Sequence, residues 1–190
     1  NGYWEKVLRI DLTKQISKAE IVPEDVWKTF IGGAGFGAKI LLEETPSRLD
    51  PFSPENKVIF GVGCWQAVNT PGNAKWSVST KSPLTKTFLD SAGSGNWGVF
   101  FKRTGYDALI IEGCSPSPVY LFISENDIEF RDAKHLWGKD TIETTKIIKT
   151  ELGKKISNIN IGPAGEVLNP IACITCDGKS FAGRGGAGAV

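Results

Sequence analysis

Residues that commonly ligate metals or act as nucleophiles are scarce in this sequence, which has one histidine and four cysteines. A single histidine cannot build a two-histidine metal site, and His135 has no G-x-S-x-G elbow or neighbouring cysteine with which to form a catalytic triad. We therefore expect His135 to be a structural or surface residue. Four unevenly spaced cysteines also exclude a secreted disulfide framework.

Charge of one sign and long apolar runs are absent too. The 22 Lys and Arg residues balance 21 Asp and Glu residues, so no basic surface is predicted for nucleic acid or an acidic membrane. No segment has the charged and apolar regions of a signal peptide or the length of a bilayer span, and we expect a cytoplasmic protein. Methionine is missing even at position 1, and the chain ends in an apolar run after a glycine cluster, so we expect a fragment of a longer protein.

Glycine, in contrast, is plentiful, and most informative in two clusters. The first glycine segment, residues 91–98, precedes the apolar and basic run at 99–103. Small residues that open a helix leave backbone N–H groups and the positive end of a helix dipole for an anion. The second glycine segment, residues 182–188, adds the guanidinium of Arg184, which suits phosphate or a fused heterocycle.

Two such anion sites indicate a large, phosphate-bearing cofactor. The alternative is that both segments are tight turns with positive φ or places where backbones pass closely. These two interpretations stay open on the residues alone.

A third cluster, residues 33–38, fits the letter of the dinucleotide fingerprint G-x-G-x-x-G/A. That fingerprint must follow a buried strand, whereas residues 24–30 are charged and helical in pattern. A close approach to another ligand, or helix packing, explains these glycines better than a Rossmann site.

Cys173 and Cys176 have the C-x-x-C spacing of metal and redox sites, but no second pair accompanies them. If the run is a strand, the odd separation puts the two sulfurs on opposite faces. We expect neither cysteine to ligate iron.

The hydrophobic pattern predicts an α+β chain dominated by antiparallel sheet. A hairpin is expected at 3–12 and 16–22, helices at 24–30, 39–44, 96–104 and 141–152, and further strands at 57–63, 76–80, 87–90, 108–112, 119–124, 128–131, 156–161 and 168–176. Gly153 ends the clearest helix.

Several motifs in one order resemble the N-terminal domain of tungsten-containing aldehyde:ferredoxin oxidoreductases. They are LRIDL at 8–12, SPENK at 53–57, TKSPLT at 80–85, GYDA at 105–108, HLWG at 135–138, IGPAGE at 161–166 and AGRGG at 182–186. The resemblance covers residues 1–190. It implies a base of two β-sheets with a few short flanking helices, which supports a bis-pterin cofactor carrying tungsten or molybdenum. Iron–sulfur and substrate domains would lie beyond this chain.

The resemblance also assigns site residues. It implies cofactor contacts from Lys75, Ala92, Gly93, Ser94, Gly95, Ser180, Phe181, Ala182, Gly183, Arg184 and Gly185, with the backbone carbonyls of Ala92 and Phe181 on a magnesium ion that bridges the two pterin phosphates. Three positions depart from the family pattern. Lys75 stands where arginine is frequent, Ala92 where asparagine is common, and Ser180 where arginine can occur. A carbonyl ligand survives the change at Ala92, but a lysine loses bidentate contact.

No catalytic residue is expected in this chain. The activity implied by the resemblance is oxidation of a small aldehyde to a carboxylic acid, with ferredoxin as electron acceptor, a 4Fe-4S cluster in the absent domains, and a homodimeric assembly. The alternatives are a related low-potential reaction such as aromatic acyl-CoA reduction, and a non-catalytic binding or assembly module.

Overall fold

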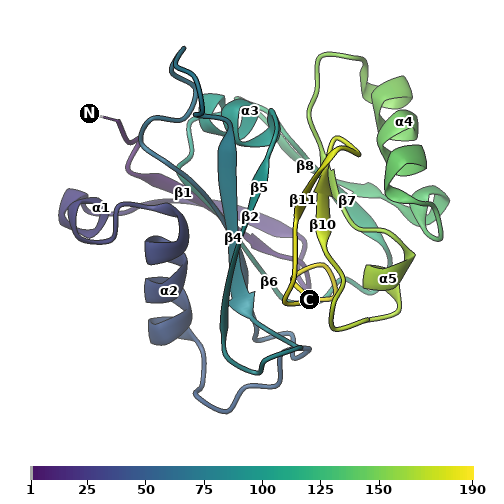
Figure 1. Cartoon of the computed structure of the whole chain (residues 1–190), viewed down its shortest axis with the longest axis horizontal. Coiled ribbons are helices and arrows are strands. Elements are labelled where there is room, and N and C mark those ends of the chain that lie inside the picture. Colours follow the sequence, from purple (N-terminus) through teal and green to yellow (C-terminus); the bar gives the residue numbers. More distant parts are fainter. Residues whose placement is uncertain (1) are drawn as a thin grey trace.

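The main body of the structure is a six-stranded sheet that is almost entirely antiparallel (Figure 1). The computed structural model describes residues 2–190. In spatial order the strands are β2 (Ile16–Ile21), β1 (Lys6–Asp11), β6 (Ala108–Glu112), β3 (Val58–Val62), β4 (Lys75–Lys81) and β5 (Phe88–Ser94). Only the β1–β6 pair is parallel within this sheet. The predicted α+β, mainly antiparallel class is confirmed.

One face of this sheet is covered by α1 (Glu24–Phe30) and α2 (Gly33–Glu44), with Trp27, Phe36 and Ile110 among the buried side chains between them (Figure 1). The third glycine cluster lies inside the first turns of α2 and follows a helix, so it is not a dinucleotide loop. A Cβ atom at Gly37 would overlap the side chain of Ser79 on β4. Glycine here permits close packing of a helix on a sheet.

The opposite face is covered by a second layer. It consists of α3 (Trp97–Arg103), the hairpin β7 (Val119–Ile123) and β8 (Ile128–Asp132), α4 (Thr141–Leu152), and a three-stranded sheet of β9 (Ile159–Asn160), β10 (Ile174–Cys176) and β11 (Ser180–Ala182). Phe60, Trp76 and Trp97 form the centre of this interface, with the two indole rings 5.6 Å apart. The expected pair of sheets is thus divided further, into sheets of six, three and two strands within residues 2–190.

The C-terminal third departs most from the expected strand boundaries. Of residues 156–161 only Ile159–Asn160 forms a strand, and of residues 168–176 only Ile174–Cys176 does. A short helix, α5 (Pro163–Glu166), and a turn occupy the intervening chain, and a 3-10 turn (Lys134–Leu136) precedes α4. None of the helices in residues 2–190 has the length and apolar character that a bilayer span requires.

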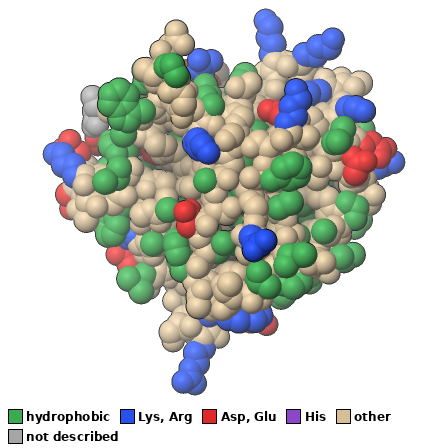
Figure 2. Space-filling view, in the orientation of Figure 1, with side chains coloured by type: hydrophobic (Ala, Val, Ile, Leu, Met, Phe, Trp, Pro, Cys, Tyr) green, Lys and Arg blue, Asp and Glu red, His purple; other side chains and the backbone are tan. Residues whose placement is uncertain are grey.

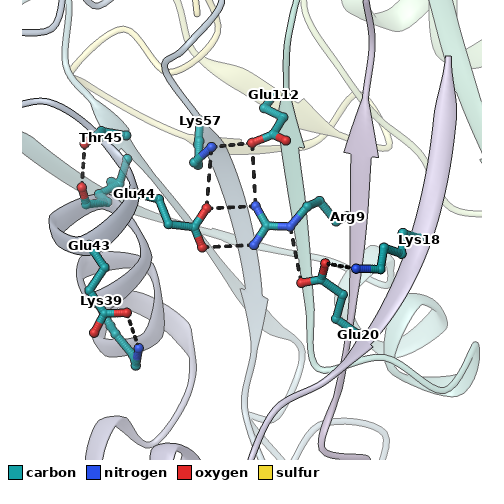
Figure 3. A network of polar contacts seen from close by, with 10 residues as sticks. Arg9, Lys18, Glu20, Lys39, Glu43, Glu44, Thr45, Lys57 and Glu112 are labelled. Atoms are coloured by element: carbon teal, nitrogen blue, oxygen red, sulfur yellow. Dashed lines mark hydrogen bonds and ion pairs between the residues drawn. The ribbon is translucent and has the colours of Figure 1, made fainter. Parts of the chain in front are cut away.

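An ion-pair network fastens the end of α2 to the sheet (Figure 3). The guanidinium of Arg9 on β1 donates to both carboxylate oxygens of Glu44 at 2.9 Å and to Glu20 at 3.3 Å. Lys57, just before β3, contacts Glu44 and Glu112. The network joins β1, β2, β6 and α2 through partly buried charges. Ion pairs contribute most to the stability of a fold when their geometry is bidentate, as it is between Arg9 and Glu44.

Candidate cofactor-binding site

The two glycine segments, far apart in sequence, meet at the junction between two sheets. β5 is the last strand of the six-stranded sheet and β11 is the first strand of the three-stranded sheet, and the two lie side by side (Figure 1). The backbone N–H of Ser94 donates to the Ser180 hydroxyl at 2.9 Å. We call this place the β5–β11 junction. Each strand is at the end of its own sheet, and the two strands contact each other.

The first glycine segment differs from the expected helix-opening loop. Residues 92–94 belong to β5, and the N–H of Gly95 donates to Ala74 O at 3.1 Å. α3 begins only at Trp97 and has seven residues. The amides of Ser94 and Gly95 are therefore engaged within the protein and are not available to an anion.

Internal packing accounts for three of the glycines. Gly93 lies under the indole of Trp76, where a Cβ would overlap the ring. Gly95 has φ +106°, and a Cβ there would come within 2.7 Å of Cys176 Sγ. Gly185 has φ +113° and lies against Leu89. Gly183, in contrast, faces open space. The turn-and-packing interpretation therefore explains Gly93, Gly95 and Gly185. It does not explain Gly183, which could approach a ligand together with its neighbour Arg184.

The second glycine segment is anchored by a residue that sequence reasoning missed. The buried hydroxyl of Ser82 donates to Gly185 O at 2.6 Å and accepts from the N–H groups of Leu84 and Thr85. Ser82 lies in the TKSPLT motif, which was the signal that could have drawn attention to it. This bond fixes the backbone immediately after Arg184.

Four of the predicted residues are exposed at or near the junction: Lys75, Ala92, Phe181 and Arg184. Lys75 lies opposite Ser94 in the β4–β5 register. Neither the Lys75 ammonium nor the Arg184 guanidinium has a hydrogen bond or ion pair with another residue in the described range 2–190. Two exposed cations without counter-charges near the junction favour an anionic ligand.

The carboxyl group nearest along β5 is that of Asp90, two residues before Ala92. Burial raises the pKa of Asp90 above its ordinary value, because desolvation disfavours the carboxylate.

The other side chains with chemistry lie apart from the junction or are buried. His135 is on the surface with Nε2 2.9 Å from Glu151, as expected for a structural or surface residue. Within residues 2–190 no three His, Cys, Asp or Glu side chains gather in a way that could hold a metal ion.

The cysteine pair is predicted to ligate no iron. Cys176 is buried beneath Gly95, and burial raises the pKa of its thiol, which opposes the thiolate that iron requires. We expect the double variant Cys173→Ser, Cys176→Ser to keep the iron content of the full-length protein unchanged, measured by plasma emission spectrometry. Loss of iron in the folded variant would contradict this.

The fold thus brings two strands from different sheets together at the β5–β11 junction, with the exposed cations Lys75 and Arg184 nearby. Residues 7–190 match the family model described as "Aldehyde ferredoxin oxidoreductase, N-terminal domain". The chain belongs to this family, and the expected resemblance is confirmed.

Relatives agree with this assignment. The chain is 44% identical over 190 residues to the tungsten-containing aldehyde ferredoxin oxidoreductase of Pyrococcus abyssi and 42% identical to that of Pyrococcus horikoshii; in both cases all of this chain aligns with 31% of the relative. A solved structure, the active site complex BamBC of benzoyl coenzyme A reductase with 1,5-dienoyl-CoA, is similar with a TM-score of 0.95 and 41% identity, over 99% of this chain and 29% of the other. The chain thus spans about a third of these relatives.

Proposed function

We propose that this chain is the cofactor-supporting domain, residues 1–190, of a tungsten or molybdenum bis-pterin oxidoreductase that oxidises small aldehydes to carboxylic acids. The observation that carries the proposal is the β5–β11 junction, where two strands from different sheets meet and the unpaired cations Lys75 and Arg184 are exposed nearby. A tungsten cofactor is implied by the names of the relatives.

The residues present fit such a group. Arg184 would contact the pterin or its phosphate through two parallel N–H bonds, and Lys75 would add a point charge. The carbonyl oxygens of Ala92 and Phe181 are hard ligands of the kind that magnesium prefers. Ser180 stands at the contact between the segments, where its hydroxyl already accepts the Ser94 N–H. Gly93, Gly95, Ala182 and Gly185 shape the backbone on which these groups stand.

When bound, the cofactor supplies the two-electron redox chemistry of the metal centre. The chain's own part is to hold the phosphates and pterin rings against a rigid sheet edge and to neutralise their charge. Residues that exclude water and handle protons would come from outside this chain, as would the 4Fe-4S cluster. We place ferredoxin as the electron acceptor, a homodimer as the assembly and the cytoplasm as the location.

A second candidate is aromatic acyl-CoA reduction. The benzoyl coenzyme A reductase complex is 41% identical to this chain, close to the 44% and 42% of the aldehyde oxidoreductases. Sequence identity in this region is therefore similar for both classes of enzyme. It supports a cofactor-binding domain that the two classes share, and it does not distinguish their substrates.

Metal analysis and assays of the full-length protein test the proposal. We expect tungsten or molybdenum with about two pterins per chain, and aldehyde-dependent reduction of a viologen dye. Reduction of the dye with a dienoyl-CoA but not with aldehydes would support the second candidate. A stably folded, metal-free and pterin-free protein would support a non-catalytic module and contradict both.

The isolated 190-residue chain should be inactive in the same assay. It would cover one side of the cofactor only, so the metal would be open to water and the polar edges of the pterins would lack partners. Turnover by this chain near the rate of the full-length enzyme would contradict the prediction.

A further inference from the structure

A large apolar cavity lies between the six-stranded sheet and the layer that covers it. Its volume is about 660 Å³, and its walls come from both layers. They include Phe60 and Leu109 of the sheet, Phe101 of α3, Leu121 of β7, Ile148 of α4 and Ile159 of β9. None of the residues predicted to contact the pterin cofactor lines it. The cavity is therefore distinct from the β5–β11 junction.

The cavity is partly open to solvent, and the β7–β8 hairpin forms its less buried wall. Phe60 and Leu109 at its floor are almost fully buried, whereas every residue of β7 is only partly buried. Protein interiors rarely contain voids larger than a few waters, and an apolar void holds water poorly. Its volume lies within the range of about 300 to 1,000 Å³ typical of small-molecule sites.

Charged side chains line the cavity where it meets solvent. Arg103, at the end of α3, and Lys155, after α4, are exposed and have no ion pair with other residues in 2–190. The two carboxylates of the lining are Glu125, which is exposed in the β7–β8 turn, and Glu166, which accepts the Gly138 N–H at 2.9 Å. Figure 2 shows several Lys and Arg side chains on the side of the molecule where α4 lies, together with acidic side chains.

We propose that this cavity binds a single-chain anionic amphiphile of the fatty carboxylate class. The hydrocarbon chain would occupy the apolar interior, where its CH₂ groups would leave water and contact apolar side chains. The carboxylate would stay at the solvent edge beside the unpaired cation Lys155, where it keeps part of its hydration. The site goes beyond the proposed cofactor function and does not depend on it.

Titration calorimetry of decanoate into the full-length protein tests the head-group part. Lys155→Glu should weaken decanoate binding about fivefold or more, the size expected for reversing one partly exposed charge. The control is Lys154→Glu, which changes a neighbouring exposed lysine that does not line the cavity and should leave affinity within about twofold. Binding of the uncharged 1-decanol should be the same in both variants. Equal effects of the two substitutions on decanoate would overturn the head-group assignment.

A cavity-filling variant tests whether the hydrocarbon chain of the ligand lies inside the cavity. Leu121→Trp should abolish binding of both decanoate and 1-decanol, while Ile21→Trp, at an exposed position on the far edge strand β2, should not. Unchanged binding in a folded Leu121→Trp protein, or no decanoate binding by the unmodified protein, would overturn the proposal. If Leu121→Trp does not fold, the comparison of decanoate binding by Lys155→Glu and Lys154→Glu still tests the proposal, because both substitutions are at exposed positions.

Discussion

Replacing Arg184 with alanine should lower the tungsten and pterin content of the purified full-length protein about tenfold or more, since a hydrogen bond to a charged group contributes about 1.5 to 3 kcal/mol. Arg184 is exposed, has no partner within residues 2–190, and stands between Gly183, which faces open space, and Gly185, whose carbonyl is held by Ser82. Its backbone is thus fixed while its side chain is free to meet a ligand. Metal and pterin analysis per mole of protein measures the effect.

The lysine variant separates charge from geometry. Arg184→Lys keeps the charge but loses the planar fork, so its cofactor content should lie between those of the arginine and alanine proteins. Arg48→Ala is a matched control, because Arg48 is also exposed and unpaired within the described residues but lies in the loop after α2. If Arg184→Ala keeps its full tungsten and pterin while its melting temperature collapses, Arg184 is a structural residue.

Elements with complete local signals could be predicted from the sequence. The helix at 141–152 matches α4 in both boundaries, because the Asp140 side chain caps its first amides and Gly153 ends it. The first hairpin is also present as predicted, since alternation and a short turn are signals carried by neighbouring residues.

The junction could not be predicted in the same way because distant partners determine it. β5 continues to Ser94 since each of its residues pairs with β4, and Gly93 is required by Trp76 from that neighbouring strand. The contact of Ser94 with Ser180 joins residues 86 positions apart. A glycine cluster read without these partners resembles a ligand loop. The motif resemblance implied that Ala92 and Phe181 serve one magnesium ion, and in the structure these residues lie on β5 and β11, which contact each other.

The short strands near the C-terminus have a related cause. Ile159–Asn160 and Ile174–Cys176 are held by pairing with each other and with β11, so their lengths depend on the register of three separated segments. Apolar residues outside these pairs, such as Ile171, remain exposed and gave a misleadingly long strand pattern.

The largest loss of stability should come from Lys102→Met, which removes one partner of a buried ion pair. Lys102 on α3 contacts Asp107, whose side chain is fully buried, and its ammonium also donates to Gly2 O at 2.9 Å. The Lys102 ammonium contacts Asp107 Oδ1, and Asp107 Oδ2 has no hydrogen-bond partner among residues 2–190. Without the ammonium, a carboxylate would be left desolvated just before β6, and breaking such a pair typically costs about 3 to 5 kcal/mol.

Hydrogen exchange of the full-length protein, followed by mass spectrometry of peptides covering α3 and β6, measures this locally. The opening free energy of these peptides should fall by about 3 to 5 kcal/mol in Lys102→Met. In the control Lys28→Met, which removes an exposed pair with Glu24, it should change by less than about 1 kcal/mol. The double variant Lys102→Met, Asp107→Leu should recover most of the loss, because it removes the stranded charge together with its partner. If the double variant is as unstable as the single one, the loss comes from packing around Lys102 and not from an unpaired Asp107.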